Sequence, residues 1–503
     1  MINPLLQRHL WTDFSLHKLL MVPALFGSVF ALGALTVAAT SADLWGFLAN
    51  IGLTLFGVIV LVAGTWRAGR TIPDQKTNRT WENIRLSSLS SWQLACGELF
   101  GATSSYWYGG VICLLMVLIS IAVSPATAKN IGNISIFVFL AALLTQVSAL
   151  QLSLSGMGTA EHNKPVSFMA CFIFSFIAPL FIRQLLDWNT ATMMSKIHIS
   201  QLPDVLLATW YGLPISNTSA IILSYVLMLI WGFIGLNQTM RRELQMSTPI
   251  IVWIGFVIFC LIYFAGFTFN PNTFDPNDTK NSAYSYAPWP LSIMMWFFNE
   301  SFSSFSFLKE QSGALLPLAF AFCLCLCLTY FMAFWEPKDI TGLRRFKAAL
   351  TQKNWRHINS LYPRWLATAQ ISIIVGLIFL TASLRTSTHS SFTLWVGAML
   401  LFLCRDLGII LLLSLQHRLG RRSFLAFAYL FALYVLFPGL LAATNGSDWV
   451  FIFLPGKAGS WPTAILPPLI QATMVWILVS RKWRLHAEIN LARRPQSSQN
   501  LSA

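Results

Sequence analysis

Long apolar runs, separated by short polar segments, dominate the hydrophobic pattern of the chain. A helix needs about 20 apolar residues to cross the hydrocarbon core of a bilayer, and runs of this length recur throughout the sequence. We therefore expect an all-α, polytopic membrane protein with about 12 transmembrane helices. The predicted spans are 20–40, 44–66, 105–124, 134–155, 165–186, 217–236, 249–269, 313–335, 366–384, 391–415, 423–443 and 461–480.

A basic, polar segment interrupts this pattern after the second predicted span. Arg67–Gly101 carries several Lys and Arg residues, which are too costly to place in hydrocarbon. The same segment holds Trp81, Ile84 and Leu86 at near-helical spacing. This pattern predicts a short amphipathic helix at the membrane surface, where it can contact a soluble partner.

The later six spans repeat the order of the earlier six. In each set a basic segment follows the second span, a short polar loop follows the fourth, and a longer segment precedes the sixth. NRTWENIRLSSLSSW aligns with KNWRHINSLYPRW, which pairs Trp81 with Trp355, and a second alignment places Gln146 opposite Arg405. We expect two parallel six-helix halves and a polar tail, at residues 1–240, 241–485 and 486–503.

Composition and charge agree with a membrane location. The 503 residues are 56% hydrophobic and 10% charged, with a net charge of +15. Most of the 33 Lys and Arg residues fall at the two termini and in alternate loops, which is the distribution that orients a membrane protein with its basic side in the cytoplasm. The charge is therefore not a sign of nucleic-acid binding. We expect a multi-pass protein of the plasma membrane, in bacteria the inner membrane, with both termini cytoplasmic.

The basic segment resembles part of a known family. RTIPDQKTNRTWENIRLSSLSSWQLACGELFGA contains a Thr-x-Glu at Thr80–Glu82, a Leu-Ser-x-Leu-Ser at Leu86–Ser90 and a Gly-x-Leu at Gly97–Leu99. In these features it is similar to the segment between the second and third spans of ABC transporter permeases of the type 2 exporter superfamily. NPLLQRHLW at the N-terminus resembles the amphipathic elbow helix of that family, and Arg241–Gln245 is expected to be its copy in the second half.

The resemblance implies a membrane-spanning permease subunit with two fused halves. In that family a coupling helix in this segment contacts a separate ABC ATPase subunit, so ATP is used by the partner and the chain itself binds no cofactor. Four positions depart from the family pattern: Arg79 replaces a usual Gly, Ser88 a Pro, Glu98 a Lys and Arg356 a Glu. The implied coupling residues are Thr80, Trp81, Glu82, Asn83, Ile84, Arg85, Leu86, Trp355, Arg356, His357 and Ile358.

Local signals around the basic segment predict how a force on it reaches the membrane. Ser90 and Gln93 fit a capping box, from which we expect a helix to run through Gly97 and Gly101 into the third span. Pro363 suits the first turn of the corresponding helix in the second half. An alternative interpretation is that Trp81 and Trp355 only anchor the chain at the membrane surface, where Trp is common.

Two adjacent charges lie near the middle of a predicted span. Arg405 and Asp406 each cost about 2.5–3.5 kcal/mol in hydrocarbon, so both should face protein or water. Adjacent helical residues point about 100° apart, although an Arg side chain is long enough to fold back. The pair is interpreted either as part of a polar patch on a substrate pathway or as a structural clamp. The fourth span would add Gln146, Ser148 and Gln151 to such a patch.

Segments on the outer side carry helix-breaking residues. QLPDVLLATWYGLP and FLPGKAGSWPTAILPP precede the sixth span of each half and look like the outer re-entrant helices of the family, although ordinary loops explain them equally well. Residues 290–308 are rich in aromatic residues and predict an interfacial or re-entrant helix rather than a thirteenth span.

Sequence motifs limit the chemistry of the chain. His residues are scattered, Cys residues have no zinc-like spacing, and neither GxSxG nor GxxxxGK[ST] occurs. We therefore expect no metal site, no enzymatic activity and no ATP binding by this chain. The leading hypothesis is an ABC exporter permease that moves an unknown substrate. The alternatives are a secondary transporter and a polytopic membrane enzyme acting on lipids.

Overall fold

The chain forms two compact helical units in the computed structural model. The first unit consists of residues Met1–Leu207 and Ile215–Thr248, and the second of Ala208–Pro214 and Pro249–Ala503. The structure describes residues 3–38, 43–155, 207–211, 213–265, 267–268, 315–336, 340–353, 355–385, 390–415, 422–443, 449, 452–453 and 460–492.

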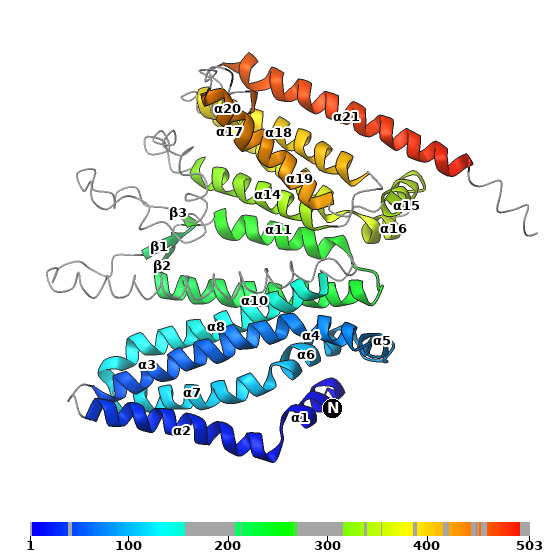
Figure 1. Ribbon diagram of the computed structural model, residues 1–503. Helices are drawn as coiled ribbons and strands as arrows, with labels where there is room; N and C mark the ends of the chain where they lie inside the picture. The colour runs from blue at the N-terminus through cyan, green and yellow to red at the C-terminus, as the bar shows by residue number, and fades with distance from the viewer. Residues whose placement is uncertain are drawn as a thin grey trace, which may run out of the picture. The chain divides into compact units, whose positions relative to one another are not determined.

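Long helices connected by short surface helices build the first unit (Figure 1). A single helical run, Leu44–Thr77, crosses the unit and extends beyond its apolar part. The described elements are α1 (Pro4–Asp13), α2 (Leu16–Ala38), α3 (Leu44–Phe56), the π-helix η1 (Gly57–Gly64), α4 (Thr65–Thr77), α5 (Trp81–Arg85), α6 (Ser91–Ala102), α7 (Ser104–Val123), α8 (Pro125–Ser155) and α10 (Asn217–Glu243).

Two apolar cores hold the first unit together. One core contains Phe56, Val60 and Val117, which join the α3–η1 run to α7, together with buried residues of α2 and α8. The other lies where α1, α4, α5, α6, α8 and α10 meet, and its fully buried members include Leu94 and Leu150. The second core thus includes the short helix α5 together with residues of five longer helices.

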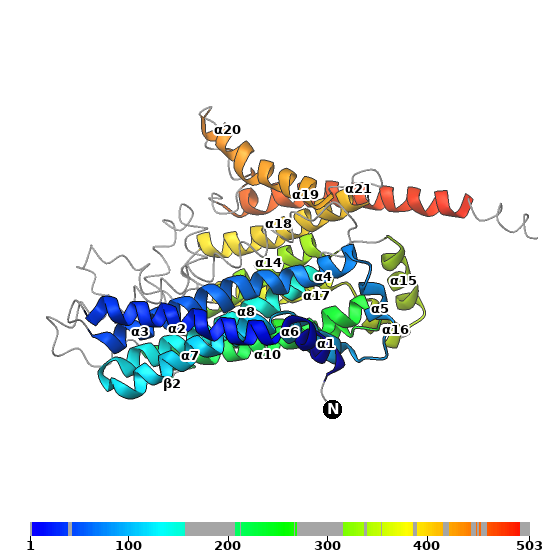
Figure 2. The same ribbon diagram turned by 60° about the horizontal axis from the view of Figure 1, so that its bottom comes forward.

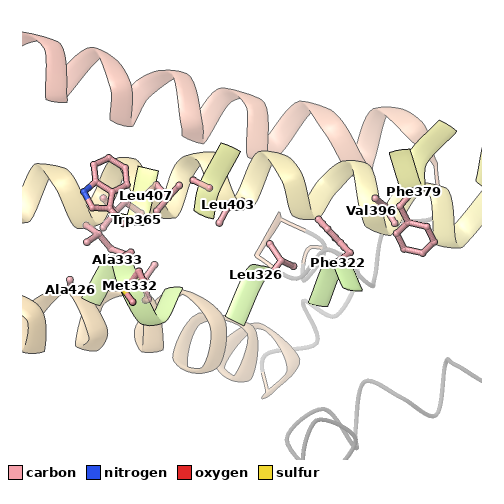
Figure 3. Packing of buried hydrophobic residues seen from close by; sticks show 14 residues of the cluster. Phe322, Leu326, Met332, Ala333, Trp365, Phe379, Val396, Leu403, Leu407 and Ala426 are labelled. Carbon is pink, nitrogen blue, oxygen red and sulfur yellow. The ribbon is translucent and has the colours of Figure 1, made fainter. Parts of the chain in front are cut away.

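The second unit also combines long apolar helices with short ones. Phe322 of α14, Phe379 of α17 and Leu403 of α18 are buried in its main core, where their side chains lie between neighbouring helices (Figure 3). The described elements are α11 (Ile250–Ala265), α14 (Leu315–Trp335), α15 (Ile340–Thr351), α16 (Trp355–Leu361), α17 (Arg364–Arg385), α18 (Ser390–Ser414), α19 (Arg422–Phe431), the π-helix η6 (Ala432–Leu436), α20 (Phe437–Ala443) and α21 (Trp461–Ala492).

These helices make the chain an all-α, multi-pass membrane protein. Eight helices in the described part of the chain are long and apolar enough to cross a bilayer. Three shorter apolar helices, Ile250–Tyr263, Ala321–Phe334 and Leu425–Leu441, coincide with further predicted spans. The remaining predicted span, 165–186, lies outside the described residues.

Short strands occupy part of the segment before α10. β1 (Leu207–Trp210) pairs antiparallel with β3 (Phe267–Thr268), with Thr209 opposite Thr268, and β2 (Leu213–Ser216) follows β1. Of the two alternatives for this segment, the re-entrant helix is therefore wrong for residues 207–211 and 213–216, because β-branched and aromatic residues such as Thr209, Trp210 and Ile215 favour extended structure.

The segment expected to correspond to it, FLPGKAGSWPTAILPP, is helical from Trp461 onward. α21 begins at Trp461, so Pro462 lies in its first turn, where a missing N–H costs nothing. Pro467 and Pro468 lie inside the same helix. Residues 454–459 and the interfacial helix expected at 290–308 lie outside the described residues.

Candidate functional site

The short helix α5 is attached to the end of α4 by a tight turn. Asn78 and Thr80 donate their backbone N–H groups to the carbonyls of Asp74 and Gln75 at 3.0 and 2.9 Å. Arg79 lies between them with a φ of 57°, in the left-handed region. This conformation favours Gly and costs other residues about 1 kcal/mol or more.

One face of α5 is buried in the core of the first unit. Trp81 is 2% exposed and Ile84 is 7% exposed. Both belong to the apolar core that includes Ile72 of α4 and Leu99 of α6. The residues of α5 expected to contact a partner thus divide into two sets, and Trp81 and Ile84 hold the helix in place.

The opposite face of α5 is exposed to solvent. Glu82 and Asn83 are exposed, and Leu86, the residue after the helix, is 83% exposed. Arg85 Nη1 lies 3.8 Å from Glu82 Oε2, an exposed pair that contributes little to stability. We call Glu82, Asn83 and Leu86 the α5 surface. Thr80 is half-buried beside it, and its hydroxyl donates to Gln75 O at 3.2 Å.

The second unit contains a turn and short helix of the same design. α15 ends with Gln352 and Lys353 donating to the carbonyls of Ala348 and Leu350, and Lys353 has a φ of 50°. Lys353 stands two residues before Trp355, as Arg79 stands two residues before Trp81. The two aligned segments thus share a backbone conformation that the sequence alignment did not use.

The α16 helix exposes a different side chain. Trp355 is 76% exposed and His357 is exposed, whereas Ile358 is 7% exposed and packs with Phe346 and Ala349 of α15. The aligned residues Ile84 and Ile358 are therefore both buried, but Trp81 and Trp355 are not equivalent in burial. The side chain of Arg356 lies outside the described residues.

The capping box predicted for α6 is confirmed. The Ser90 hydroxyl accepts from Gln93 N at 3.3 Å, and Gln93 Oε1 accepts from Ser90 N at 3.0 Å. The helix does not continue without a break into the next span: α6 ends at Ala102, Thr103 has a φ of −102° and a ψ of 1°, and α7 starts at Ser104. Pro363 immediately precedes α17, where Glu336 Oε2 accepts from Trp365 N at 3.1 Å.

The N-terminal helix α1 packs against α6 through two glycines. A Cβ atom at Gly97 would lie 2.8 Å from Leu5 Cβ, and one at Gly101 would lie 2.6 Å from His9 Cδ2. The amide of Asn3 adds a hydrogen bond to Gln93 O at 2.5 Å. A separate N-terminal helix therefore exists as expected. Its predicted copy at Arg241–Gln245 is wrong, because these residues form the end of α10 and a turn.

A buried carboxylate beside α1 was not singled out as a site by the sequence. Glu98 is fully buried, accepts from Gln75 Nε2 at 2.7 Å, and lies 3.6 Å from His9 Nε2. The available signal was a carboxylate in an otherwise apolar stretch of α6. These contacts link α1, α4 and α6 next to α5.

Gln146 of α8 joins three helices inside the first unit. Its Nε2 atom donates to Val60 O of η1 at 2.8 Å, and its Oε1 atom accepts from Trp107 Nε1 of α7 at 3.0 Å. Gln151 donates to Gly232 O of α10 at 2.6 Å, and Ser148 is half-buried. Both amides are thus bound to neighbouring helices.

Arg405 and Asp406 pair with each other inside the second unit. Arg405 folds back so that its Nε and Nη2 atoms each lie 2.8 Å from Asp406 Oδ1. The guanidinium also lies 4.3 Å from the ring of Phe402 and donates to Gln471 of α21 at 2.6 Å. Asp406 Oδ2 accepts from Tyr330 of α14 at 2.7 Å and from Tyr434 of η6 at 2.6 Å. The cluster joins α14, α18, η6 and α21.

Within the described residues, no group of three or more His, Cys, Asp or Glu side chains is placed to hold a metal ion.

Comparison of the chain with protein-family models, with curated proteins and with solved structures finds no match.

Proposed function

We propose that this protein is the membrane-spanning permease subunit of an ATP-driven ABC exporter. The observation that carries the proposal is the α5 surface. A very short helix is anchored by Trp81 and Ile84 to the ends of several long helices, while Glu82, Asn83 and Leu86 are left exposed. A partner bound to this surface would move the ends of those helices.

The partner in this proposal is an ABC ATPase. The chain contains no nucleotide-binding motif, so ATP is bound and hydrolysed by the partner. Closure of two ATPase domains would act on α5 in the first unit and on α16 in the second, and would switch the access of a central pathway between the two sides of the membrane. The apolar, aromatic-rich spans suit an amphiphilic substrate.

The orientation follows from the same proposal. The surfaces of α5 and α16 lie in the basic segments that the charge distribution assigns to the cytoplasm. Both termini are then cytoplasmic, and the protein resides in the plasma membrane, which in bacteria is the inner membrane.

Copurification from the native host tests the proposal. The tagged wild-type protein should retain an ABC ATPase. Leu86→Asp should lower its recovery at least tenfold, because a charge at the centre of an interface costs well over 1.4 kcal/mol. Leu86→Met keeps an apolar side chain and should retain the ATPase. Trp81→Ala is unsuitable as a test, since it removes a core side chain and destabilises the fold itself.

Two results would contradict this proposal. The first is a folded wild-type protein that retains no ATPase, and the second is equal recovery with Leu86→Asp and Leu86→Met. The first result would favour the second candidate, a secondary transporter. The observation that supports this candidate is the buried pair of Arg405 and Asp406 within a predicted span.

A further inference from the structure

The helical run that ends at α5 contains a wide, π-helical segment. Leu44–Thr77 is one run of 34 residues, and its middle part, η1, is an eight-residue π-helix between two α-helical parts. A π-helix holds more residues per turn than an α-helix, because each backbone N–H bonds to the carbonyl five residues earlier instead of four, and π segments are often functional sites. η1 is therefore the place in this run where bending or rotation is least costly.

The side chain of Gln146 supports this segment from α8. Gln146 is fully buried and donates to Val60 O, a backbone carbonyl inside η1, at 2.8 Å. The preceding residue of α8, Thr145, also makes a hydrogen bond to this run, since its hydroxyl lies 2.9 Å from that of Thr65, the first residue of α4. The amide oxygen of Gln146 is held by Trp107 Nε1, which fixes the orientation of the side chain.

The absence of a side chain at Gly64 makes room for this contact. A Cβ atom at Gly64 would lie 2.5 Å from Gln146 Nε2, which is too close for any real contact. Gly57, at the other end of η1, has open space around its Cβ position. A methyl group would therefore displace Gln146 at Gly64 but meet nothing at Gly57, which makes Gly57 the control position within η1.

A related arrangement recurs in the second unit. Asp406 lies on α18, which aligns with α8, and accepts a hydrogen bond from Tyr434 inside the π-helix η6. It also accepts a hydrogen bond from Tyr330 of α14. α14 follows α11 in the second unit, and the α3–α4 run likewise follows α2 in the first unit. A polar residue of the aligned helix thus contacts a π-helix in each unit, although η1 lies in the second predicted span of its half and η6 in the fifth.

We propose that η1 is a hinge in the Leu44–Thr77 helix and that Gln146 is the positioning residue that sets its geometry. When α5 is displaced, α4 moves with it because both share one apolar core. With the hydrogen bond from Gln146 to Val60 O in place, η1 bends in one direction and the displacement reaches α3. Without this bond, η1 bends in many directions and α3 does not move with α4. This inference rests on the proposed function for the origin of the displacement, but the hinge itself is a property of this chain alone.

Spin-label distances across the hinge test the inference without a partner. Phe47 of α3 and Asn78 at the end of α4 are exposed and lie on either side of η1, so both accept labels. In the full chain in lipid nanodiscs, Gly64→Ala and Gln146→Leu should broaden the distribution of distances between the labels. Gly57→Ala should leave the distribution as in the wild type. If Gly64→Ala and Gly57→Ala give the same distribution, Gln146 does not position the hinge.

A double substitution separates positioning from general damage. Gln146→Ala removes the atom with which a Gly64 methyl group would collide. Adding Gly64→Ala to Gln146→Ala should therefore broaden the distribution no further, whereas additive broadening would overturn the mechanism.

A second arm uses the copurified ATPase. With ATP and vanadate, the wild type and Gly57→Ala should show a shifted distance, while Gly64→Ala should retain the ATPase and lose the shift. A wild type with no ATPase and no shift would overturn the proposed function but not the hinge, which the partner-free distances decide. An equal shift in Gly64→Ala and Gly57→Ala would overturn the role of the hinge in coupling.

Discussion

At the scale of single residues, burial distinguishes the aromatic side chains that the sequence could not. Trp81 and Trp355 align and both looked like partner contacts, yet Trp81 is buried and Trp355 is exposed. A five-residue helix is too short for its hydrophobic pattern to specify a buried face. The neighbouring helices decide it, because Trp81 packs with core residues of α4 and α6, whereas the cluster formed with α15 includes Ile358 and Leu361 of α16 but not Trp355.

The charged pair in the second unit shows what the sequence predicts and what it omits. It predicted that Arg405 and Asp406 avoid lipid and that Arg405 is able to fold back, and the structure shows the folded-back pair. It gave no sign that Tyr330, Tyr434 and Gln471 would complete the cluster. These residues are distant in sequence and carry polar groups that are common in any helix, so only the packing of the helices reveals them.

The same cluster leads to a prediction about stability. Asp406→Asn should destabilise the protein by about 3–5 kcal/mol, because Arg405 would keep its charge without a buried partner. Replacing both charges, with Arg405→Met and Asp406→Leu, should restore most of the loss. Thermal unfolding of the purified protein in detergent measures both effects.

An exposed carboxylate provides the control for that prediction. Asp43 precedes α3, is exposed, and makes no capping hydrogen bond with its side chain, so Asp43→Asn should change the unfolding temperature little. Equal unfolding temperatures for Asp406→Asn and Asp43→Asn would show that the cluster does not hold its four helices together.

At the scale of helices, the sequence predicted where a helix starts better than it predicted the type of helix in its interior. The Ser90 and Gln93 pair gave the start of α6 because a capping box is encoded in a few adjacent residues. The π-helix at Gly57–Gly64 could not be predicted, because GVIVLVAG is apolar throughout and has the same pattern in an α-helix. The strand at Leu207–Trp210 was missed because a re-entrant helix and an ordinary loop were the two alternatives considered for this segment.

The contact between α1 and α6 gives a prediction at this scale. Gly101→Ala would place a methyl group 2.6 Å from His9 Cδ2 and should detach α1 from α6. Amide hydrogen exchange of residues 4–13 in the full chain should then become faster, by about fivefold for each 1 kcal/mol of lost contact.

Gly132→Ala is the matched control, because nothing lies within 4 Å of a Cβ atom at Gly132 in α8. Its exchange over residues 4–13 should equal that of the wild type. If Gly101→Ala exchanges no faster than Gly132→Ala, the close approach of α1 does not depend on the missing side chain.

At the scale of the whole molecule, hydrophobic length predicted the class of the protein. The multi-pass helical fold is confirmed because the cost of burying polar groups in lipid imposes long apolar helices that are visible in any sequence. The division into 1–240, 241–485 and 486–503 stays a prediction. The two compact units divide at Thr248–Pro249, after the end of α10, except that Ala208–Pro214 belongs to the second unit. Arg79 and Lys353 share a left-handed conformation at aligned positions, but Gln245 after α10 has it as well.

Site-specific photo-crosslinking tests the central claim, that the α5 surface binds an ABC ATPase. A photoreactive amino acid at Asn83, which is exposed on α5, should yield a covalent adduct that mass spectrometry identifies as an ABC ATPase from the native host. The same amino acid at Val111, which is 50% exposed on the apolar helix α7, should yield no such adduct. A folded protein with no ATPase adduct at Asn83, or with equal adducts at the two positions, would contradict the account.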